Sequence, residues 1–543
     1  MALALSVITL VSMAGCGGDG GFKRDSSSEY DPNKRYLNIG NFNGGLGYAW
    51  LEEVANNYMA EHEDVVIKIN NDKDGFAENI LTEKMEEYGN DLYFINGFTY
   101  DNLVSKGLAE DVTKEVTEII EGEGRSIADK LDPSLKKIMN KNGKYYGLPF
   151  FDAIFGTVYD VDLFDQYGFY FDAEGNIIGE GAEKTNLSAG PNGIAGDYDD
   201  GLPATISQWK ALLQEIKAYS MTPYTWTGEY EYYRYRWLAS VWADYEGKEA
   251  FDLNNSLNGE YTFPGDTEPT QITIENAYRL QEQPGKLFAL EMAEHIIRNN
   301  YYQKTAFDSV NTHTMAQNDF LLSVEASQLS SGTQRIAMIL EGGWWENEAR
   351  AFADQMAKDF ENPDYAFGQR KFGFMPAPKA DDGSSAEGTT LISSTGNSMV
   401  FVASCSEQKE LAKDFFKYAH TDESMRIFTR VTGSIRPFDY TIEESDKAQM
   451  TYYAQNMWDI YRNENTDICH VTLFDNDVFT LEPSFLGQSN WWWGSTQANG
   501  AKYQDAMYEM SEDSSLTAQA YFEGLQKTYS KKNWDDQLSK YYK

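Results

Sequence analysis

The chain has 543 residues, enough for two or three domains, each with a buried core. It carries 45 Lys and Arg residues against 85 Asp and Glu residues, a formal net charge of −40 at pH 7. A surface this acidic repels the phosphates of nucleic acids and anionic membrane faces, so we exclude both as partners recognised through charge.

The N-terminus has the features of a lipoprotein signal. Residues 1–15 are apolar but too few to span a membrane as a permanent helix, and small residues precede Cys16. This segment resembles a bacterial lipobox, which implies that residues 1–16 are a signal segment and that Cys16 is lipidated. Residues 17–35, rich in Gly, Ser, Asp and Lys, predict a flexible tether. Acyl chains on Cys16 would anchor the protein to the outer face of the cell membrane.

Strands and helices are expected to alternate from Tyr36 onward. Three runs have the composition of strands: 37–40, 65–69 and 91–95. Two segments between them have the apolar spacing of helices: 50–58, which begins with Trp50, and 77–88. This order is typical of a mostly parallel α/β sheet. Asn96, Phe98 and Tyr100 follow the third run, and the carboxyl end of such a strand is where open sheets bind ligands.

A polar insertion over 170–203 raises the question of a metal ion. Asn192, Asp197, Asp199 and Asp200 bring amides and carboxylates close together, and calcium prefers several oxygen ligands. The spacing does not reproduce an EF-hand loop. The sequence therefore leaves two alternatives open, a calcium site and a solvated, turn-rich loop.

Aromatic residues gather in the next segment. A helix is predicted over 205–219, and Tyr224 and Trp226 follow it. The segment 230–245 contains Tyr232 and Tyr233 among many other aromatic residues. Aromatic faces can bind the apolar faces of sugar rings or fill a core, so these residues are candidate cleft walls or ordinary packing.

A buried strand is predicted over Ile336–Leu340, and it ends at two glycines that deliver Trp344 and Trp345. By itself the segment leaves two alternatives open, a ligand platform at the carboxyl end of a strand or two rings packed in the core, with Trp345 the candidate packing partner. Near the C-terminus stand three successive tryptophans, at 491–493. They cannot all face inward on one helix or strand, so we expect at least one to be exposed.

The cysteines do not predict a zinc site. Cys16, Cys405 and Cys469 lack the CxxC spacing of zinc ligands, and the five His residues are scattered. Cys405 and Cys469 could form a disulfide in an oxidising compartment or remain two separate thiols. The sequence leaves both open.

Several motifs resemble the extracellular solute-binding proteins of ABC importers, in the broad family 1 whose best-known members bind maltose and other sugars. They are, in chain order, Asp91-Leu92-Tyr93-Phe94, Gly147-Leu148-Pro149, Trp209-Lys210-Ala211-Leu212-Leu213, Gly342-Gly343-Trp344, Met375-Pro376-Ala377-Pro378 and Gly433-Ser434-Ile435-Arg436-Pro437. The resemblance covers roughly residues 36–440. The chain is longer than compact family members and is similar to the larger branch that takes oligosaccharides, some members of which carry a structural calcium.

The resemblance implies an α/β fold of two lobes, each a mostly parallel sheet flanked by helices, with the ligand in the cleft between them. The first lobe would comprise 36–148 plus about 399–445, and the second 149–398 plus about 446–543. Trp344 would stack on a sugar, and the loop after Phe94 would contribute hydrogen bonds. The residues expected to contact the ligand are Trp344, Trp345, Asn96, Phe98, Tyr100, Trp226, Tyr224 and Trp50.

The expected function is that of a bacterial, lipid-anchored binding protein that captures an oligosaccharide and delivers it to the permease subunits of an ABC importer. It is not expected to be an enzyme, because no carboxylate pair, nucleophile elbow or P-loop stands in a recognisable motif. A glycoside hydrolase is the enzymatic alternative. The other alternative is that the same fold binds a peptide, a polyamine or another solute, since a fold does not fix its ligand.

Overall fold

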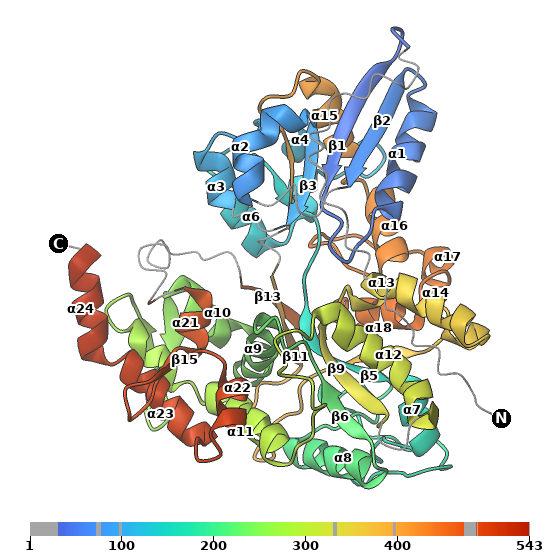
Figure 1. Cartoon of the computed structure of the whole chain (residues 1–543). Coiled ribbons are helices and arrows are strands. Elements are labelled where there is room, and N and C mark those ends of the chain that lie inside the picture. The colour runs from blue at the N-terminus through green and yellow to red at the C-terminus, as the bar shows by residue number, and fades with distance from the viewer. Residues whose placement is uncertain are drawn as a thin grey trace.

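The computed structural model describes residues 31–71, 78–96, 100–329, 334–394, 398–471, 485 and 487–541. They form two α/β lobes, one above the other in Figure 1, each with its own sheet and hydrophobic core. This is the two-lobed fold that the sequence predicts. No helix in this part of the chain is long and apolar enough to cross a membrane. The predicted signal segment, with Cys16, lies outside the described residues.

The first lobe contains a five-stranded sheet in the order β2-β1-β3-β12-β4. Its strands are β1 (Arg35–Asn41), β2 (Val65–Asn71), β3 (Leu92–Asn96), β4 (Leu148–Pro149) and β12 (Ser398–Val402). The first three pair in parallel, and β12 runs antiparallel to both β3 and β4. The sheet is therefore mostly parallel, with one reversed strand.

Helices cover the first-lobe sheet. They are α1 (Ala49–Glu61), α2 (Glu78–Tyr88), α3 (Tyr100–Ser105), α4 (Thr113–Thr117), α5 (Ile127–Lys130), α6 (Pro133–Met139), α15 (Lys409–Tyr418) and α16 (Asp422–Thr432). Helix α1 buries Trp50, Val54 and Tyr58 because their four-residue spacing places them on one face. The Trp50 ring lies edge-on against Phe94 and Phe428, with ring centroids 5.2 and 4.9 Å away.

The second lobe contains a four-stranded sheet in the order β10-β5-β9-β6. Its strands are β5 (Phe155–Asp160), β6 (Thr222–Thr225), β9 (Ile336–Gly342) and β10 (Phe372–Met375). β6 and β9 pair in parallel, whereas β5 runs antiparallel to both β9 and β10. All seven residues of β9 are buried, as expected of a central strand.

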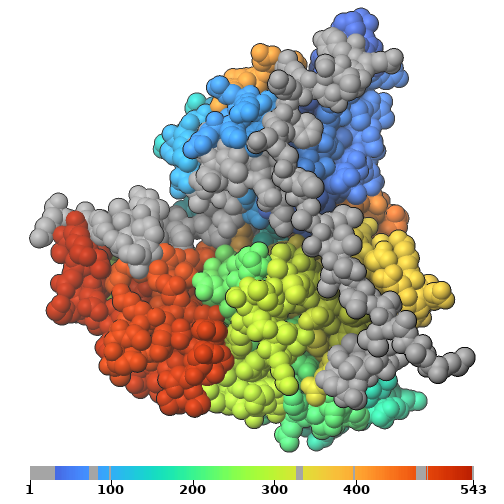
Figure 2. Space-filling model, in the orientation of Figure 1, coloured from blue at the N-terminus to red at the C-terminus, as the bar shows by residue number. Residues whose placement is uncertain are grey.

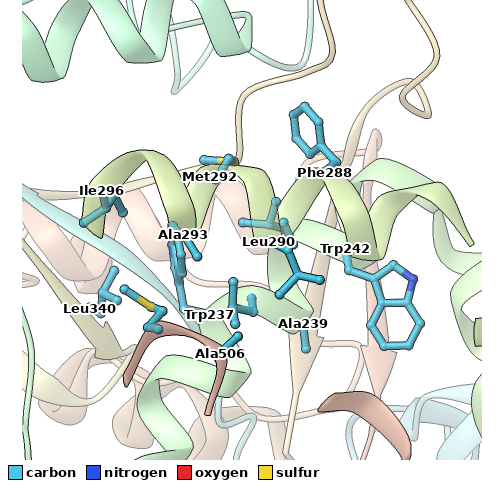
Figure 3. Close-up of a cluster of buried hydrophobic side chains, with 14 of the residues drawn as sticks. Trp237, Ala239, Trp242, Phe288, Leu290, Met292, Ala293, Ile296, Leu340 and Ala506 are labelled. Carbon is cyan, nitrogen blue, oxygen red and sulfur yellow. The ribbon is translucent and has the colours of Figure 1, made fainter. Parts of the chain in front are cut away.

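Helices pack on both sides of this sheet. They are α7 (Val161–Tyr167), α8 (Ile206–Ala218), α9 (Tyr232–Glu246), α10 (Lys248–Ser256), α11 (Pro284–Arg298), α12 (His313–Leu329), α13 (Trp345–Glu348) and α14 (Arg350–Asp359). Figure 3 shows part of the core where α9 and α11 meet, with Trp237 and Trp242 near Leu290 and Ala293. Helix α9 is buried on nearly all sides because it lies between the sheet and α11.

The reversed strand of each sheet is the one by which the chain enters that lobe. β5 follows β4 of the first lobe, and β12 follows β11 (Thr389–Ser393), which pairs in parallel with β13 (Thr466–His470). A third crossing leads from α16 through α17 (Glu444–Lys447) to α18 (Tyr452–Tyr461), which packs against β10. Within the described residues, three crossing segments therefore join the lobes.

Asp152 ties these crossings together. The Ser393 hydroxyl donates to Asp152 Oδ1 at 2.7 Å, and the Tyr461 hydroxyl donates to its other carboxylate oxygen. The backbone N–H of Asp152 donates to the carbonyl of Ile435 at 2.8 Å. Because Asp152 is buried, the two hydroxyl donors compensate for the cost of burying its carboxylate, and the backbone bond ties it to the third crossing.

The C-terminal region packs onto the second lobe and ends at the left of Figure 1. Its elements are α21 (Gln488–Trp493), β14 (Ser495–Thr496), β15 (Lys502–Tyr503), α22 (Ala506–Glu512), α23 (Ala518–Thr528) and α24 (Lys531–Tyr541). We call residues 487–541 the C-terminal tail. Helices α22 and α23 pack against α11, so the tail is an integral part of the second lobe.

The prediction that one of the three successive tryptophans is exposed is wrong. Trp491, Trp492 and Trp493 are all fully buried. Trp493 Nε1 donates to the carbonyl of Tyr235 at the start of α9, whereas Trp491 lies 5.4 Å from the ring of Trp534 in α24. Helix α21 lies between α9 and α24, and a short helix covered on both sides can bury side chains that point in every direction.

The two described cysteines are free thiols. Cys469 lies in β13 and is fully buried, whereas Cys405 is partly buried beside the first-lobe core. The alternative of two separate thiols is therefore the one that the structure shows.

Candidate functional site

Trp344 stands where the second-lobe sheet meets the crossing into the first lobe. In the antiparallel pairing of β5 with β9, Phe155 lies opposite Gly342. The backbone N–H of Gly343 then donates to the carbonyl of Ile154 at 2.8 Å, which fixes the turn after β9 to the crossing segment. The turn ends at Trp344, and α13 begins at the next residue.

The Trp344 ring is held on two sides and remains partly exposed. It meets the Phe155 ring edge-on, with ring centroids 5.0 Å apart and an angle of 84° between the ring planes. Its six-membered ring lies over Gly342, where a β-carbon would come within 2.3 Å of Trp344 Cη2. Glycine at 342 is therefore required for this ring position, because any side chain would displace the ring.

Tyrosines from the start of α9 extend this surface. The ring centroid of Tyr232 lies 6.1 Å from Phe155, 4.5 Å from Tyr233 and 5.9 Å from Tyr230. We call Phe155, Tyr230, Tyr232, Tyr233 and Trp344 the cleft aromatic group. Three of its members, Tyr230, Tyr232 and Trp344, are partly exposed, and such rings can stack on a ligand that has an apolar face.

Carboxylates lie behind these rings. Gln317 Nε2 donates to Glu341 Oε1 at 3.1 Å and to Glu348 Oε2 at 2.8 Å, so one amide joins two carboxylates. His313 Nε2 is 3.3 Å from Glu348 Oε1. Burial, reinforced by the charge of Glu348, raises the pKa of Glu341 well above its usual value. Glu341 is only 2% exposed, so it supports the rings from behind and does not face a ligand.

The first lobe reaches this surface through the loop after β1. Asn347 Nδ2, in α13, donates to the carbonyl of Gly45 at 2.7 Å across the two lobes. A β-carbon on Gly45 would lie 2.5 Å from Trp344 Cδ1, so the backbone of this loop touches the indole ring. Trp344 is thus contacted from both lobes, and the surface around this ring, where the lobes meet, is the candidate site.

Comparison with protein families identifies the chain. The model described as "bacterial extracellular solute-binding protein" matches residues 44–426, more than half of the sequence. The chain belongs to this family. Among curated proteins, none matches it.

Solved structures share the fold of this solute-binding protein at low sequence identity. One, from work on xylan utilisation by the thermophilic bacterium Caldanaerobius polysaccharolyticus, is 15% identical, covers 91% of this chain and 99% of its own, and has a TM-score of 0.55. A chitin oligosaccharide binding protein is 16% identical, with 92% and 99% coverage and a TM-score of 0.53. The GacH receptor of Streptomyces glaucescens, solved unliganded and with acarbose, is 13% identical, with 93% and 99% coverage and a TM-score of 0.51.

The structure places several predicted contact residues of the solute-binding protein in its cores. Trp345 is fully buried among Phe320, Phe372 and Tyr453, as its role of packing partner requires. Trp50 and Tyr100 are buried in the first lobe, and the Tyr100 hydroxyl donates to the carbonyl of Met139 at 2.8 Å. None of these three rings has a face available to a ligand in this structure.

Two further predicted residues are corrected for the same reason. Tyr224, in β6 beside β9, is buried, and its hydroxyl accepts a hydrogen bond from Trp209 Nε1 at 3.1 Å. Trp226 is fully buried and stacks on Tyr302, with ring centroids 5.4 Å apart. Trp209 and Tyr302 come from other parts of the chain, and their contacts make both predicted residues part of the core.

The remaining predicted residues belong to the first lobe. Asn96 ends β3 and is partly exposed, opposite Ser398 of β12. Phe98 lies outside the described residues. Their contacts with a ligand stay predictions. Sequence reasoning missed Gly45 and Asn347, and only the Gly44-Gly45 pair, a turn signal after a predicted strand, could have pointed to the loop.

The loop at 192–200 hydrogen-bonds mainly to itself. Asn192 donates from its backbone N–H to Asp199 Oδ2 and from its amide to Asp197 Oδ2, both at 3.0 Å, and Gly196 N–H donates to Asp200 Oδ2 at 2.8 Å. No group of three or more acidic, His or Cys side chains within the described ranges could hold a metal ion. Asp199 Oδ1 is nevertheless buried without a hydrogen-bond partner. These contacts fit a turn-rich loop, and calcium binding stays a prediction.

Substitution of Gly45 is expected to separate the lobes. In a Gly45→Ala variant the new β-carbon would collide with Trp344, so the loop must withdraw. We expect a larger radius of gyration in small-angle scattering. Gly47→Ala is the matched control, because both glycines have positive φ, 76° and 66°, but a β-carbon at Gly47 would lie 3.7 Å from Asn347 Nδ2. Equal scattering from the two variants would contradict the contact.

Asp199 is expected to make stability depend on pH. Burial, with the charges of Asp197 and Asp200, raises the pKa of Asp199 from 3.8 to about 7. The folded state therefore binds the proton more tightly, and this residue's contribution to stability falls as pH rises from about 4 to about 7. The melting temperature of an Asp199→Asn variant, relative to the wild type, should rise between pH 5 and pH 8.

The same variant tests calcium. Bound calcium would stabilise the ionised form of Asp199, so millimolar calcium at pH 8 should raise the melting temperature of the wild type and leave the Asn variant unchanged. Glu183→Gln serves as a control for loss of charge in the insertion, because Glu183 is exposed and is not one of the four candidate ligands. No response of the wild type to calcium or to its chelation would remove the calcium prediction.

Proposed function

We propose that this protein is the substrate-binding lipoprotein of a bacterial ABC importer and that it captures an oligosaccharide between its lobes. One observation carries the proposal: the partly exposed Trp344 ring of the second lobe is touched by the Gly45 loop of the first. A ligand stacked on this ring lies within reach of both lobes. The similar structures described with chitin oligosaccharide and with acarbose support a sugar as the ligand class.

Capture works by closure and requires no bond chemistry. A sugar that stacks on the cleft aromatic group and also accepts hydrogen bonds from the first lobe binds the closed form more tightly than the open form. That difference in binding free energy shifts the population toward closure. The crossing segments act as the hinge, because the hydrogen bonds of Asp152 to Ser393 and Ile435 join these segments to one another. Permease subunits would then recognise the closed form.

A cationic solute such as a polyamine is the second candidate. Glu229 and Glu231 are exposed on either side of Tyr230, and ammonium groups bind both to carboxylates and to the faces of aromatic rings. A glycoside hydrolase has less support, since Glu341 and Glu348 share Gln317 behind the rings and do not flank a sugar bond.

The decisive experiment is a calorimetric and thermal-shift screen of the purified protein against xylo-, malto- and chito-oligosaccharides, polyamines and peptides. We expect a neutral oligosaccharide to bind. Trp344→Ala should weaken that binding by about 1.5 kcal/mol, roughly tenfold in Kd, because a stacked ring is lost. Trp344→Phe should retain part of the affinity. Stabilisation by polyamines alone, or full affinity in the Ala variant, would contradict the proposal.

Lipidation at Cys16 rests on the sequence and has its own test. Full-length protein expressed in a bacterial host should partition into the detergent phase and take up labelled fatty acid, whereas Cys16→Ala should do neither. Ligand affinity should be equal in the two proteins, because residues 17–35 separate the anchor from the lobes. A wild-type protein that remains in the aqueous phase without label would refute the anchor.

A further inference from the structure

A second cavity lies beside the cleft aromatic group, between the second lobe and the C-terminal tail. Its volume is about 670 Å³, and its walls come from loops 228–231 and 307–309 and from tail residues between 490 and 529. In Figure 2 the orange-to-red tail adjoins yellow-green residues of the second lobe. Ligand pockets in proteins commonly measure about 300–1,000 Å³, so this space is large enough for a short oligosaccharide.

A buried ion pair fixes the tail as one wall. Arg234, near the start of α9, donates from Nε and Nη2 to Asp505 Oδ2 at 2.9 and 2.6 Å, and from Nη1 to the carbonyl of Thr227 at 2.6 Å. Arg234 is buried, so these charge-assisted bonds are shielded from solvent. The wall is thereby joined to the same helix that begins with Tyr232 and Tyr233.

The loop over 229–231 joins the cavity to the cleft aromatic group. Glu229 and Glu231 both line the cavity, and Tyr230 stands between them in the chain. Burial and the charge of Glu229 raise the pKa of Tyr230. From Tyr230, ring contacts of about the same length lead through Tyr232 and Phe155 to Trp344. A row of rings therefore runs from Trp344 to the loop that lines the cavity.

The lining has the chemistry of a sugar site. Tyr508 is 40% exposed and lines the cavity, and its ring meets Phe307 edge-on with centroids 5.9 Å apart. Phe307 is supported in turn by Trp226, 5.3 Å away, so the Tyr508 ring rests on packed aromatic residues. An exposed tyrosine face with amides and carboxylates around it can stack on one sugar ring while accepting and donating hydrogen bonds to hydroxyls.

The charge of the residues that line the cavity indicates which class of sugar it can accept. Glu229, Glu231, Asp308 and Glu509 line the cavity, against Lys502 and the Arg234 already paired with Asp505. This excess of carboxylates repels uronic acids and sulfated sugars, whereas the hydroxyls of neutral sugars can donate to them.

We propose that this cavity is a second subsite for the same ligand, which holds the distal residues of a neutral oligosaccharide whose other end stacks on Trp344. The inference rests on the proposed function, since it extends the same site. Two of the tryptophans that sequence reasoning could not place, Trp491 and Trp493, contact α24 and α9, and thus help to hold the tail that forms the wall. The tail therefore selects ligand length.

The test is a length series. Calorimetry with neutral xylo-, malto- and chito-oligosaccharides from disaccharide to hexasaccharide should show that affinity of the wild type increases with length within the accepted series. In a Tyr508→Ala variant the longer members should bind about tenfold more weakly, because a stacked ring is lost, while the shortest ligand keeps its affinity. Tyr508→Phe should behave as the wild type. Trp344→Ala should weaken binding at every length.

The control is Tyr452→Ala, which removes another exposed tyrosine, one on α18 that does not line the cavity. It should leave all affinities unchanged, and melting temperatures show whether each variant is folded. If Tyr508→Ala has no effect at any length, or the same effect at all lengths, the second subsite is refuted while the proposed function stands. If no oligosaccharide binds the wild type, both are refuted.

Discussion

Because β5 is the strand by which the chain enters the second lobe, its pairing with β9 brings the hinge and the ligand platform together. Phe155 begins β5 and lies opposite Gly342, and the next turn, tied to Ile154, carries Trp344. Any opening of the lobes must bend the chain within a few residues of this ring. The platform stays attached to the second lobe, whereas the Gly45 loop belongs to the first. Hinge bending thus changes the distance between the two walls without disturbing either sheet.

The C-terminal tail has a comparable effect on the other side of the site. It buries three tryptophans against α9 and α24 and joins Arg234 to Asp505, so it stiffens the helix that carries Tyr232 and Tyr233. Separating a buried arginine from its carboxylate partner costs free energy, because each would be left as an uncompensated charge. The tail therefore packs beside the helix that carries part of the cleft aromatic group and not at a remote surface.

Much of the fold follows from local patterns. The strands β1, β2, β3 and β9 and the helices α1 and α8 lie close to the segments predicted from apolar spacing, because a long, strongly periodic segment has one way to bury its apolar face. Trp344 follows a buried strand and a Gly-Gly turn, and its ring is partly exposed; its contact with a ligand stays a prediction. Trp50, Tyr100, Tyr224 and Trp226 look equally suitable in the sequence, yet other elements cover them.

From the sequence alone, the ordered motifs indicated the family, and that resemblance implied the two α/β lobes. The turn before Trp344 was predictable from its neighbours in the chain, a buried strand and Gly342-Gly343. Only the tertiary structure decided which aromatic residues remain exposed. A ring is hidden or free according to what packs on it from distant segments: α24 covers Trp491, Tyr302 covers Trp226, and nothing among the described residues fully covers Trp344. Burial depends on all these contacts at once, and no local spacing of residues records it.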